Sequence, residues 1–306
     1  MLDCWMMCMK NVEFSHTLLL DGPTGTELQR RGFDTHLPLW SARALLEAPE
    51  VVEQIHREYI AAGAGLITTN SFRTNRRVVE RAGYSSEDAK DLTHLSAQLA
   101  KRAISLSGRE GIVIAGSDAP VEDCYSPDLV PTDAELREEH EEHIAWLVEA
   151  NCDLVLIETM NTLREAMIAS EVAASFDIPF IVSLVTDTTG RSLLSGELLS
   201  EGVRYLAEYQ PAAILTNCSA PRAVLKATEI LAEVKRSTNA EWEFGGYANS
   251  GEPDPVLGWD FVQTVPIDRF VASAIEMVNL GARLIGSCCG TTPEYTKELA
   301  EAVGSG

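Results

Sequence analysis

Eight short apolar segments, separated by longer amphipathic stretches, constrain the fold of this sequence more than any other feature. Apolar residues within each segment follow one another without regular polar alternation, which is typical of parallel strands covered on both faces. The segments are residues 17–22, 65–71, 112–117, 153–159, 179–185, 212–219, 243–250 and 282–288. We therefore expect eight buried parallel β-strands.

The stretches between these segments show the apolar spacing of helices, for example at 49–62, 87–105, 133–150, 162–175 and 268–280. Eight strands alternating with helices predict an α/β fold, a single (β/α)8 TIM barrel, over residues 16–306. The alternative is an open doubly wound sheet. That fold requires a GxGxxG turn after its first strand, and DGPTGTEL at 21–28 lacks this spacing. Residues 1–15 are expected to form a loosely held N-terminal extension.

Charge and composition indicate which kinds of binding partner this protein can have. The 306 residues carry a formal net charge of −22, and 45% of them are hydrophobic. Repulsion from phosphates and anionic lipids argues against nucleic-acid and membrane partners. No apolar run approaches the roughly 20 residues of a membrane span, and the first residues do not resemble a signal peptide. We expect a cytoplasmic location, in which the seven cysteines are free thiols or metal ligands.

Polar or small residues end several of the predicted strands. They include Asp21-Gly22, Thr69-Asn70, Glu158-Thr159, Asn217-Cys218, Asn249-Ser250 and Cys288-Cys289. The carboxyl ends of all strands in a barrel open on the same face, where active sites are built. These scattered residues are therefore expected to converge on one mouth.

Cys218, Cys288 and Cys289 are the strongest candidates for chemistry. They end the sixth and eighth predicted strands, which are next-nearest neighbours in a closed barrel, so their sulfurs can meet. Three thiolates around a zinc ion, with the fourth position open to substrate, make a catalytic site. Gly286 and Gly290 allow the irregular backbone that would turn both adjacent sulfurs inward. Two alternatives stay open: burial as small apolar residues, and a strained vicinal disulfide.

The remaining cysteines and two histidines are interpreted as structural. The cysteines expected to be ordinary buried side chains are Cys4, Cys8, Cys124 and Cys152. His140 and His143, within REEHEEHIAW, superficially suggest a metal motif. Because they lie on a Glu-rich helix, we expect them on a solvated face.

Six motifs follow one another along the chain: LLLDGPTGTELQRRG at 18–32, ITTNSF at 67–72, LVLIET at 154–159, TNCSAP at 216–221, YANSGEP at 247–253 and GSCCGTTPE at 286–294. In this order they resemble the homocysteine S-methyltransferase family. That family includes S-methylmethionine- and betaine-dependent enzymes and the homocysteine domain of cobalamin-dependent methionine synthase. The resemblance covers about residues 17–300, and GxCCGT with an upstream NC is its most specific part.

The resemblance implies a homocysteine-binding barrel domain over residues 16–306, with Zn²⁺ held by Cys218, Cys288 and Cys289. The residues implied to hold the amino-acid end of homocysteine are Asp21, Gly22, Thr69 and Glu158. A buried carboxylate such as Glu158 suits an α-ammonium group, and backbone N–H groups near Gly22 and Thr69 suit a carboxylate. Asn217, next to a ligand, is expected to orient the substrate or the sulfur.

The expected activity is zinc-dependent transfer of a methyl group from a small cationic donor to the homocysteine thiol, giving methionine. A metal ionises the bound thiol, so no catalytic group beyond the zinc site is expected. S-methylmethionine is the favoured donor and S-adenosylmethionine a secondary one.

Other activities stay open. The segments at 115–127 (AGSDAPVEDCYSP) and 253–263 (PDPVLGWDFVQ) differ from the methylmethionine enzymes, so a betaine-like donor or another thiol acceptor is the alternative. A zinc hydrolase or a thiol-binding protein on the same barrel is the alternative of another class. The sequence gives no expectation for the oligomeric state.

Overall fold

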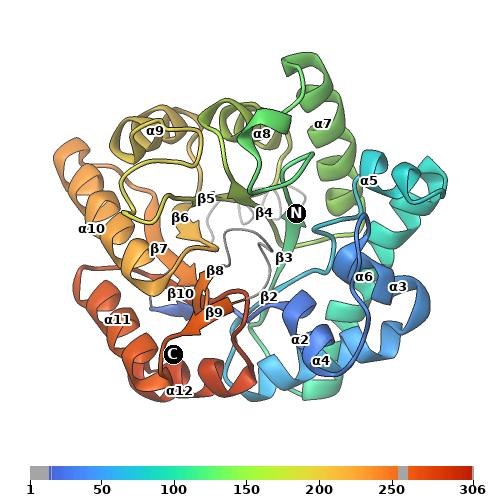
Figure 1. The fold of residues 1–306 in the computed structure, drawn as a ribbon, viewed down its shortest axis with the longest axis horizontal. Helices are drawn as coiled ribbons and strands as arrows, with labels where there is room; N and C mark the ends of the chain where they lie inside the picture. Colours follow the sequence, from blue (N-terminus) through green and yellow to red (C-terminus); the bar gives the residue numbers. More distant parts are fainter. Residues whose placement is uncertain (1–13, 15, 254–260, 305–306) are drawn as a thin grey trace, which may run out of the picture.

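The computed structural model describes residues 14, 16–253 and 261–304, and its strands form the predicted barrel (Figure 1). In this part of the chain eight parallel strands pair in the order β1-β10-β7-β6-β5-β4-β3-β2. Their bounds are β1 (Leu18–Leu19), β2 (Leu66–Thr68), β3 (Val113–Asp118), β4 (Leu154–Met160), β5 (Phe180–Val185), β6 (Ala213–Asn217), β7 (Glu243–Ala248) and β10 (Leu284–Ser287). Each strand falls on one of the eight apolar segments, so the predicted α/β TIM-barrel fold is confirmed.

The barrel closes at a short seam between β1 and β2. One isolated parallel bridge, Leu20↔Leu66, joins the two strands, and the Asp21 N–H donates to the Leu66 carbonyl at 3.0 Å. The Asp21 carboxyl group extends this pairing. Its two oxygens accept hydrogen bonds of 2.9 Å from the N–H and the hydroxyl of Thr68. A side chain therefore completes the joint that the backbone begins.

Helices surround the barrel on its outer side (Figure 1). Their bounds are α2 (Thr24–Arg30), α3 (Arg43–Glu47), α4 (Pro49–Ala61), α5 (Arg76–Arg81), α6 (Ser86–Ser107), α7 (Asp133–Glu149), α8 (Leu163–Ser175), α9 (Leu199–Leu206), α10 (Pro221–Thr238), α11 (Ile267–Asn279) and α12 (Pro293–Val303). All five helices predicted from apolar spacing are present. Ser85 and Thr132 start α6 and α7 with capping boxes, which fixes where these two helices begin. Within the described ranges, each helix is too short or too polar to cross a membrane.

Apolar side chains form two layers, one on each face of the barrel strands. Leu154 and Leu156 of β4 belong to the cluster inside the barrel, whereas Val155 and Ile157 belong to the larger cluster between strands and helices. Successive strand residues point to opposite faces. Both faces are covered, which is why the strand segments are continuously apolar.

A short hairpin follows β7 and is not predicted by the apolar spacing. Its strands, β8 (Gly251–Pro253) and β9 (Phe261–Thr264), pair antiparallel before α11. The N-terminal extension is expected at residues 1–15. Of these, only Phe14 belongs to the described residues. The proposed division into an extension and a barrel domain therefore stays a prediction.

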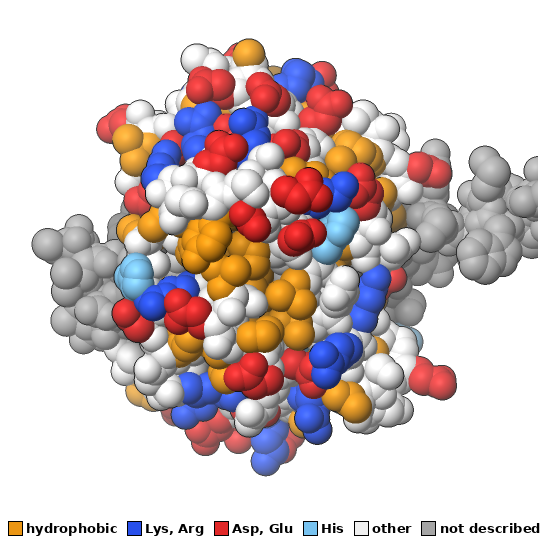
Figure 2. Space-filling model, turned by 90° about the vertical axis from the view of Figure 1, so that its right-hand side faces the viewer, with side chains coloured by type: hydrophobic (Ala, Val, Ile, Leu, Met, Phe, Trp, Pro, Cys, Tyr) orange, Lys and Arg blue, Asp and Glu red, His pale blue; other side chains and the backbone are white. Residues whose placement is uncertain are grey.

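Charged side chains of both signs cover the side of the barrel that bears α3, α5 and α6. Figure 2 shows acidic and basic groups interspersed around a hydrophobic patch on this face. Ion pairs such as Arg76 with Glu142 and Arg81 with Glu122 involve α5. Although the net charge of the chain is negative, this face of the protein therefore carries both acidic and basic side chains.

His140 and His143 lie in the core, so the expectation of a solvated helix face is wrong. The side chains of both histidines, which belong to α7, are almost fully buried. Their Nδ1 atoms lie 2.7 and 2.8 Å from the two carboxylate oxygens of Asp118, the last residue of β3. His140 Nε2 is also 3.4 Å from Glu165 of α8.

Charge pairing explains why these groups tolerate burial. Burial is the largest single influence and lowers the pKa of His140, but the charges and hydrogen bonds of Asp118 and Glu165 together outweigh it and raise this pKa to about 10. Burial likewise opposes ionisation of Asp118, yet the charge of His140 and hydrogen bonds from both histidines lower its pKa to about 2. The sequence pattern of α7 could not show this, because the partner carboxylate is on another element.

Candidate functional site

A cavity opens at the carboxyl ends of the barrel strands. Seven of the predicted site residues line it: Asp21, Gly22, Thr69, Glu158, Cys218, Cys288 and Cys289. The eighth, Asn217, is fully buried behind the cavity wall. The structure thus gathers the predicted residues at the barrel face on which TIM-barrel enzymes build their active sites.

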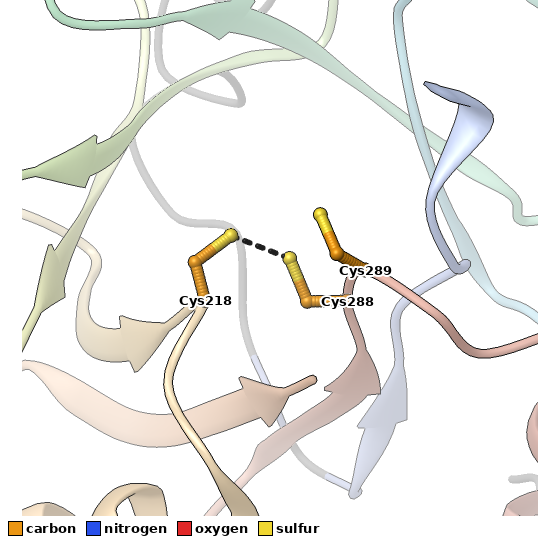
Figure 3. A group of neighbouring side chains, drawn as sticks. All are labelled: Cys218, Cys288 and Cys289. Carbon is orange, nitrogen blue, oxygen red and sulfur yellow. Dashed lines mark hydrogen bonds between the residues drawn. The ribbon is translucent and has the colours of Figure 1, made fainter. Parts of the chain in front are cut away.

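Three cysteine sulfurs face one another in this cavity (Figure 3). The Sγ atoms of Cys218, Cys288 and Cys289 all lie within 4.8 Å of one another, and those of Cys218 and Cys288 are 2.7 Å apart. All three are free thiols, so the vicinal disulfide is not formed. Two sulfurs that bind one tetrahedral zinc ion at about 2.3 Å lie about 3.8 Å apart. The three sulfurs are close enough together to share a single ion.

Irregular backbone at the strand ends turns these sulfurs inward. Cys218, just after β6, has a φ of +49°, a left-handed conformation that non-glycine residues rarely adopt. Gly290, directly after the cysteine pair, has a φ of +78°. The Cys288 N–H donates to the Ala248 carbonyl at the end of β7, at 2.7 Å. The predicted departure from regular strand geometry is therefore present at Gly290, whereas Gly286 lies within β10 and the turn at Cys218 was not predicted.

The three thiols differ in how readily they ionise. Hydrogen bonds from the thiols of Cys218 and Cys289 lower the pKa of Cys288 well below its usual value. The same contact with Cys288 raises the pKa of Cys218 well above its usual value. One buried thiolate is therefore favoured at this position, and a divalent cation would favour ionisation of the other two.

Asn217 reaches the sulfurs through Thr159. Its Nδ2 donates to the Thr159 hydroxyl at 2.8 Å, and its Oδ1 accepts from the Ser183 hydroxyl at 2.8 Å. The Thr159 hydroxyl in turn donates to Cys218 Sγ at 3.9 Å. Thr159 has a φ of +61° and lies where the register between β4 and β5 shifts. This irregularity aims the hydroxyl at the sulfur.

Two buried carboxyl groups, Asp21 and Glu158, lie on the wall of the same cavity. Glu158 accepts hydrogen bonds from the hydroxyls of Ser117 and Tyr247 at 2.5 and 3.0 Å. Burial raises the pKa of Glu158 to about 7 and that of Asp21 to about 8, despite the hydrogen bonds that both accept. A cation bound beside them would return both groups to the charged form.

Gly22 and Thr69 shape the wall in different ways. A Cβ atom at Gly22 would lie 2.6 Å from the ring of Tyr59, so the packing requires glycine. The Thr69 N–H donates to the Ala115 carbonyl at 2.9 Å, and its hydroxyl accepts from the Ser117 N–H at 3.0 Å. The Thr69 N–H is thus already used within the barrel, so the predicted carboxylate contact near Thr69 would have to use a neighbouring group.

Among the other residues that line the cavity are Trp40, Phe72 and Cys124, which the sequence did not single out for function. The rings of Trp40 and Phe72 meet edge to face, with centroids 6.1 Å apart. Phe72 ends the ITTNSF motif, which is a usable signal, but Trp40 lies in a segment without a motif. Cys124 is buried, as predicted. Its place on the cavity wall could not be predicted, because it lies on a loop.

The family model described as homocysteine S-methyltransferase matches residues 18–303. Homocysteine S-methyltransferase YbgG of Bacillus subtilis is 30% identical over 300 residues, which cover 92% of this chain and 93% of that protein. Selenocysteine methyltransferase of Astragalus bisulcatus is 27% identical over 321 residues, with 94% and 93% covered. The similarity therefore extends over nearly the whole of each relative.

A solved structure shows the same arrangement of elements. The metallated form of the homocysteine methyltransferase MmuM from Escherichia coli matches with a TM-score of 0.81 at 26% identity, covering 94% of this chain and 96% of that one. Fold, cavity position and family match agree. This chain is a methyltransferase and belongs to the homocysteine S-methyltransferase family.

Proposed function

We propose that this protein transfers a methyl group from a small cationic donor to the sulfur of homocysteine, giving methionine, with a zinc ion held by Cys218, Cys288 and Cys289. The observation that carries the zinc site is the group of three buried sulfurs within 4.8 Å of one another on the cavity wall. Thiolates are preferred zinc ligands, and three of them leave one position for a substrate sulfur.

The contribution of the protein is to hold the reacting groups in place. Bound zinc would supply a Lewis acid that keeps the homocysteine sulfur ionised at neutral pH. The Thr159 hydroxyl orients Cys218 Sγ, and Asn217 holds Thr159. The sulfonium or quaternary ammonium centre of the donor becomes a neutral sulfide or amine when its methyl group is displaced. The displacement therefore requires no acid or base from the chain.

Asp21 and Glu158 are proposed to bind the α-ammonium group of homocysteine. Both are buried on the cavity wall, and burial raises the pKa of each carboxyl group. An ammonium group between them gains two charge-assisted hydrogen bonds and relieves the cost of burying their charges. Gly22 and Thr69, on the same wall, are proposed to border the carboxylate end of the substrate.

The aromatic part of the wall favours a donor with a positive methyl-bearing centre. Trp40 and Phe72 both border the cavity, and aromatic ring faces attract sulfonium and quaternary ammonium groups. S-methylmethionine is the favoured donor and S-adenosylmethionine a secondary one. A betaine-like donor is the alternative, since it presents the same kind of cation.

Metal analysis combined with a methyl-transfer assay tests this function. We expect one zinc ion per chain, methionine formed from homocysteine with S-methylmethionine, and loss of activity on chelation that added zinc restores. The acceptor panel should include selenocysteine, because a similar protein is named for that substrate. Full activity in metal-free protein would overturn the zinc site. Failure of all three donor types with homocysteine would overturn the reaction.

A further inference from the structure

Cys124 lies beside the proposed metal site, on the loop that follows β3. Its side chain is 1% exposed and lines the same cavity as the three-cysteine group. Burial raises the pKa of the Cys124 thiol to about 12, and a charge on Cys288 adds to this shift. Cys124 in turn contributes to the raised pKa of Cys289. Cys124 therefore borders the same buried space as the three sulfurs.

The loop is fixed on both sides of Cys124. The Asp123 carbonyl accepts a hydrogen bond of 3.0 Å from the Asn161 side chain. The Tyr125 hydroxyl donates to the Cys218 carbonyl at 3.3 Å, which ties the loop to the backbone of a proposed ligand. Cys124 is thus held between two anchored neighbours against the cavity.

Cys124 is the best remaining donor for a fourth zinc position. A tetrahedral ion bound by three cysteines has one further position to fill. Among the Asp, Glu, His and Cys side chains that the described residues place on the cavity wall, only Asp21, Cys124 and Glu158 remain. Both oxygens of each carboxyl group already accept hydrogen bonds. Cys124 offers the same soft donor atom as the other three ligands.

We propose that Cys124 is the fourth ligand of the metal in the substrate-free protein and that the homocysteine sulfur replaces it. This inference rests on the zinc site of the proposed function. Cys124 is outside the group of sulfurs that all lie within 4.8 Å of one another. It therefore has to turn its side chain toward the metal in order to bind it, so the substrate sulfur can displace it readily.

The exchange conserves atoms and charge. The homocysteine thiol loses its proton as its sulfur takes the fourth position, and the released Cys124 sulfur takes up that proton. One thiolate replaces another, so the buried site gains no net charge when the acceptor binds. Substrate binding would then require no proton release to solvent.

Cobalt substitution tests the ligand count directly. In the absence of homocysteine, Cys124→Ser should lower the thiolate-to-cobalt charge-transfer absorption of the full-length protein by about one quarter, in proportion to one of four thiolates. Its zinc dissociation constant, measured by chelator competition, should rise at least about tenfold. With saturating homocysteine, variant and wild type should give the same spectrum. Cys152→Ser is the matched control, because Cys152 is a buried thiol outside the cavity, with its pKa also raised to about 12.

X-ray absorption at the zinc edge of wild-type protein tests the proposal without a variant. Four sulfurs at about 2.3 Å in the substrate-free state are expected. Three sulfurs with one lighter atom, or a Cys124→Ser protein with unchanged cobalt spectrum and zinc affinity, would overturn the role of Cys124 and leave the zinc site intact. A wild-type protein that binds neither zinc nor cobalt would overturn the zinc site itself.

Discussion

Two buried polar clusters lie at the same end of the barrel, on opposite faces of its strands. Ser117 and Asp118, the last two residues of β3, mark the division. The Ser117 hydroxyl donates to Glu158 at the cavity, whereas Asp118 contacts His140 and His143 behind the strand. The comparison teaches that position at a strand end is not enough. Only side chains that point into the barrel can meet a substrate.

The two clusters also differ in their electrostatics. In the outer cluster, opposite charges meet and the pKa shifts favour the ionised forms of Asp118 and His140. In the inner cluster, acidic groups crowd together, and burial raises the pKa of Asp21 and Glu158. The outer cluster is complete without a ligand, while the inner one favours a bound cation. We expect substitutions outside to affect stability and substitutions inside to affect activity.

The largest effect is expected from Cys289→Ala. Loss of a ligand should remove the metal and lower kcat/KM at least about a thousandfold, because a catalytic ion contributes several kcal/mol to transition-state stabilisation. Metal analysis and initial rates check this. The buried thiol Cys152, outside the cavity, provides the control, since Cys152→Ala should keep both metal and activity. A Cys289→Ala protein that is metal-free but fully active would break the distinction between the clusters.

His140→Gln should have the second-largest effect, on stability. Removing one partner of a buried ion pair leaves Asp118 without its main cationic partner, which costs about 3 kcal/mol of unfolding free energy. Urea denaturation measures this loss. Zinc content and the KM for homocysteine in the folded fraction should equal those of wild type. A lowered zinc content in folded His140→Gln would contradict the conclusion that the outer cluster serves only the stability of the fold.

The pH dependence of that difference sharpens the comparison. The folded-state pKa of His140 is raised from 6.5 to about 10, so its contribution is fully present below pH 6.5 and is lost as pH rises through about 10. The pKa of Asp118 is lowered from 3.8 to about 2, so its contribution is present above 3.8 and lost as pH falls through 2. The stability gap between wild type and His140→Gln should therefore shrink on the alkaline side.

Thr159→Val is expected to have the smallest effect, within the inner cluster. Valine keeps the branched shape but removes the hydroxyl that donates to Cys218 Sγ. Loss of a hydrogen bond to a metal ligand should weaken zinc binding about tenfold. Chelator competition measures this, and Thr159→Ser should restore affinity. Unchanged affinity in Thr159→Val would show that the hydroxyl does not support the ligand.

The fold was predictable because each barrel strand is a continuous apolar run, as at Leu154–Ile157, where alternate residues serve two cores. The cysteine site was predictable because Cys218 and the later pair end strands on the same barrel face. The role of His143 was not, because its partner Asp118 is far away in sequence and the Glu-rich helix pattern carries no information about it. The left-handed backbone at Thr159 also left no sequence signal.

The seam between β1 and β2 gives Asp21 two duties at once. Its carboxyl group borders the cavity and also bonds to Thr68 across the only bridge that closes β1 onto β2 in the described chain. A substitution of Asp21 would therefore destabilise the contact between β1 and β2 and weaken binding of the acceptor at the same time. Evolution of a new donor preference, through Trp40 or Phe72, would be tolerated more readily, because these side chains border the cavity without joining strands.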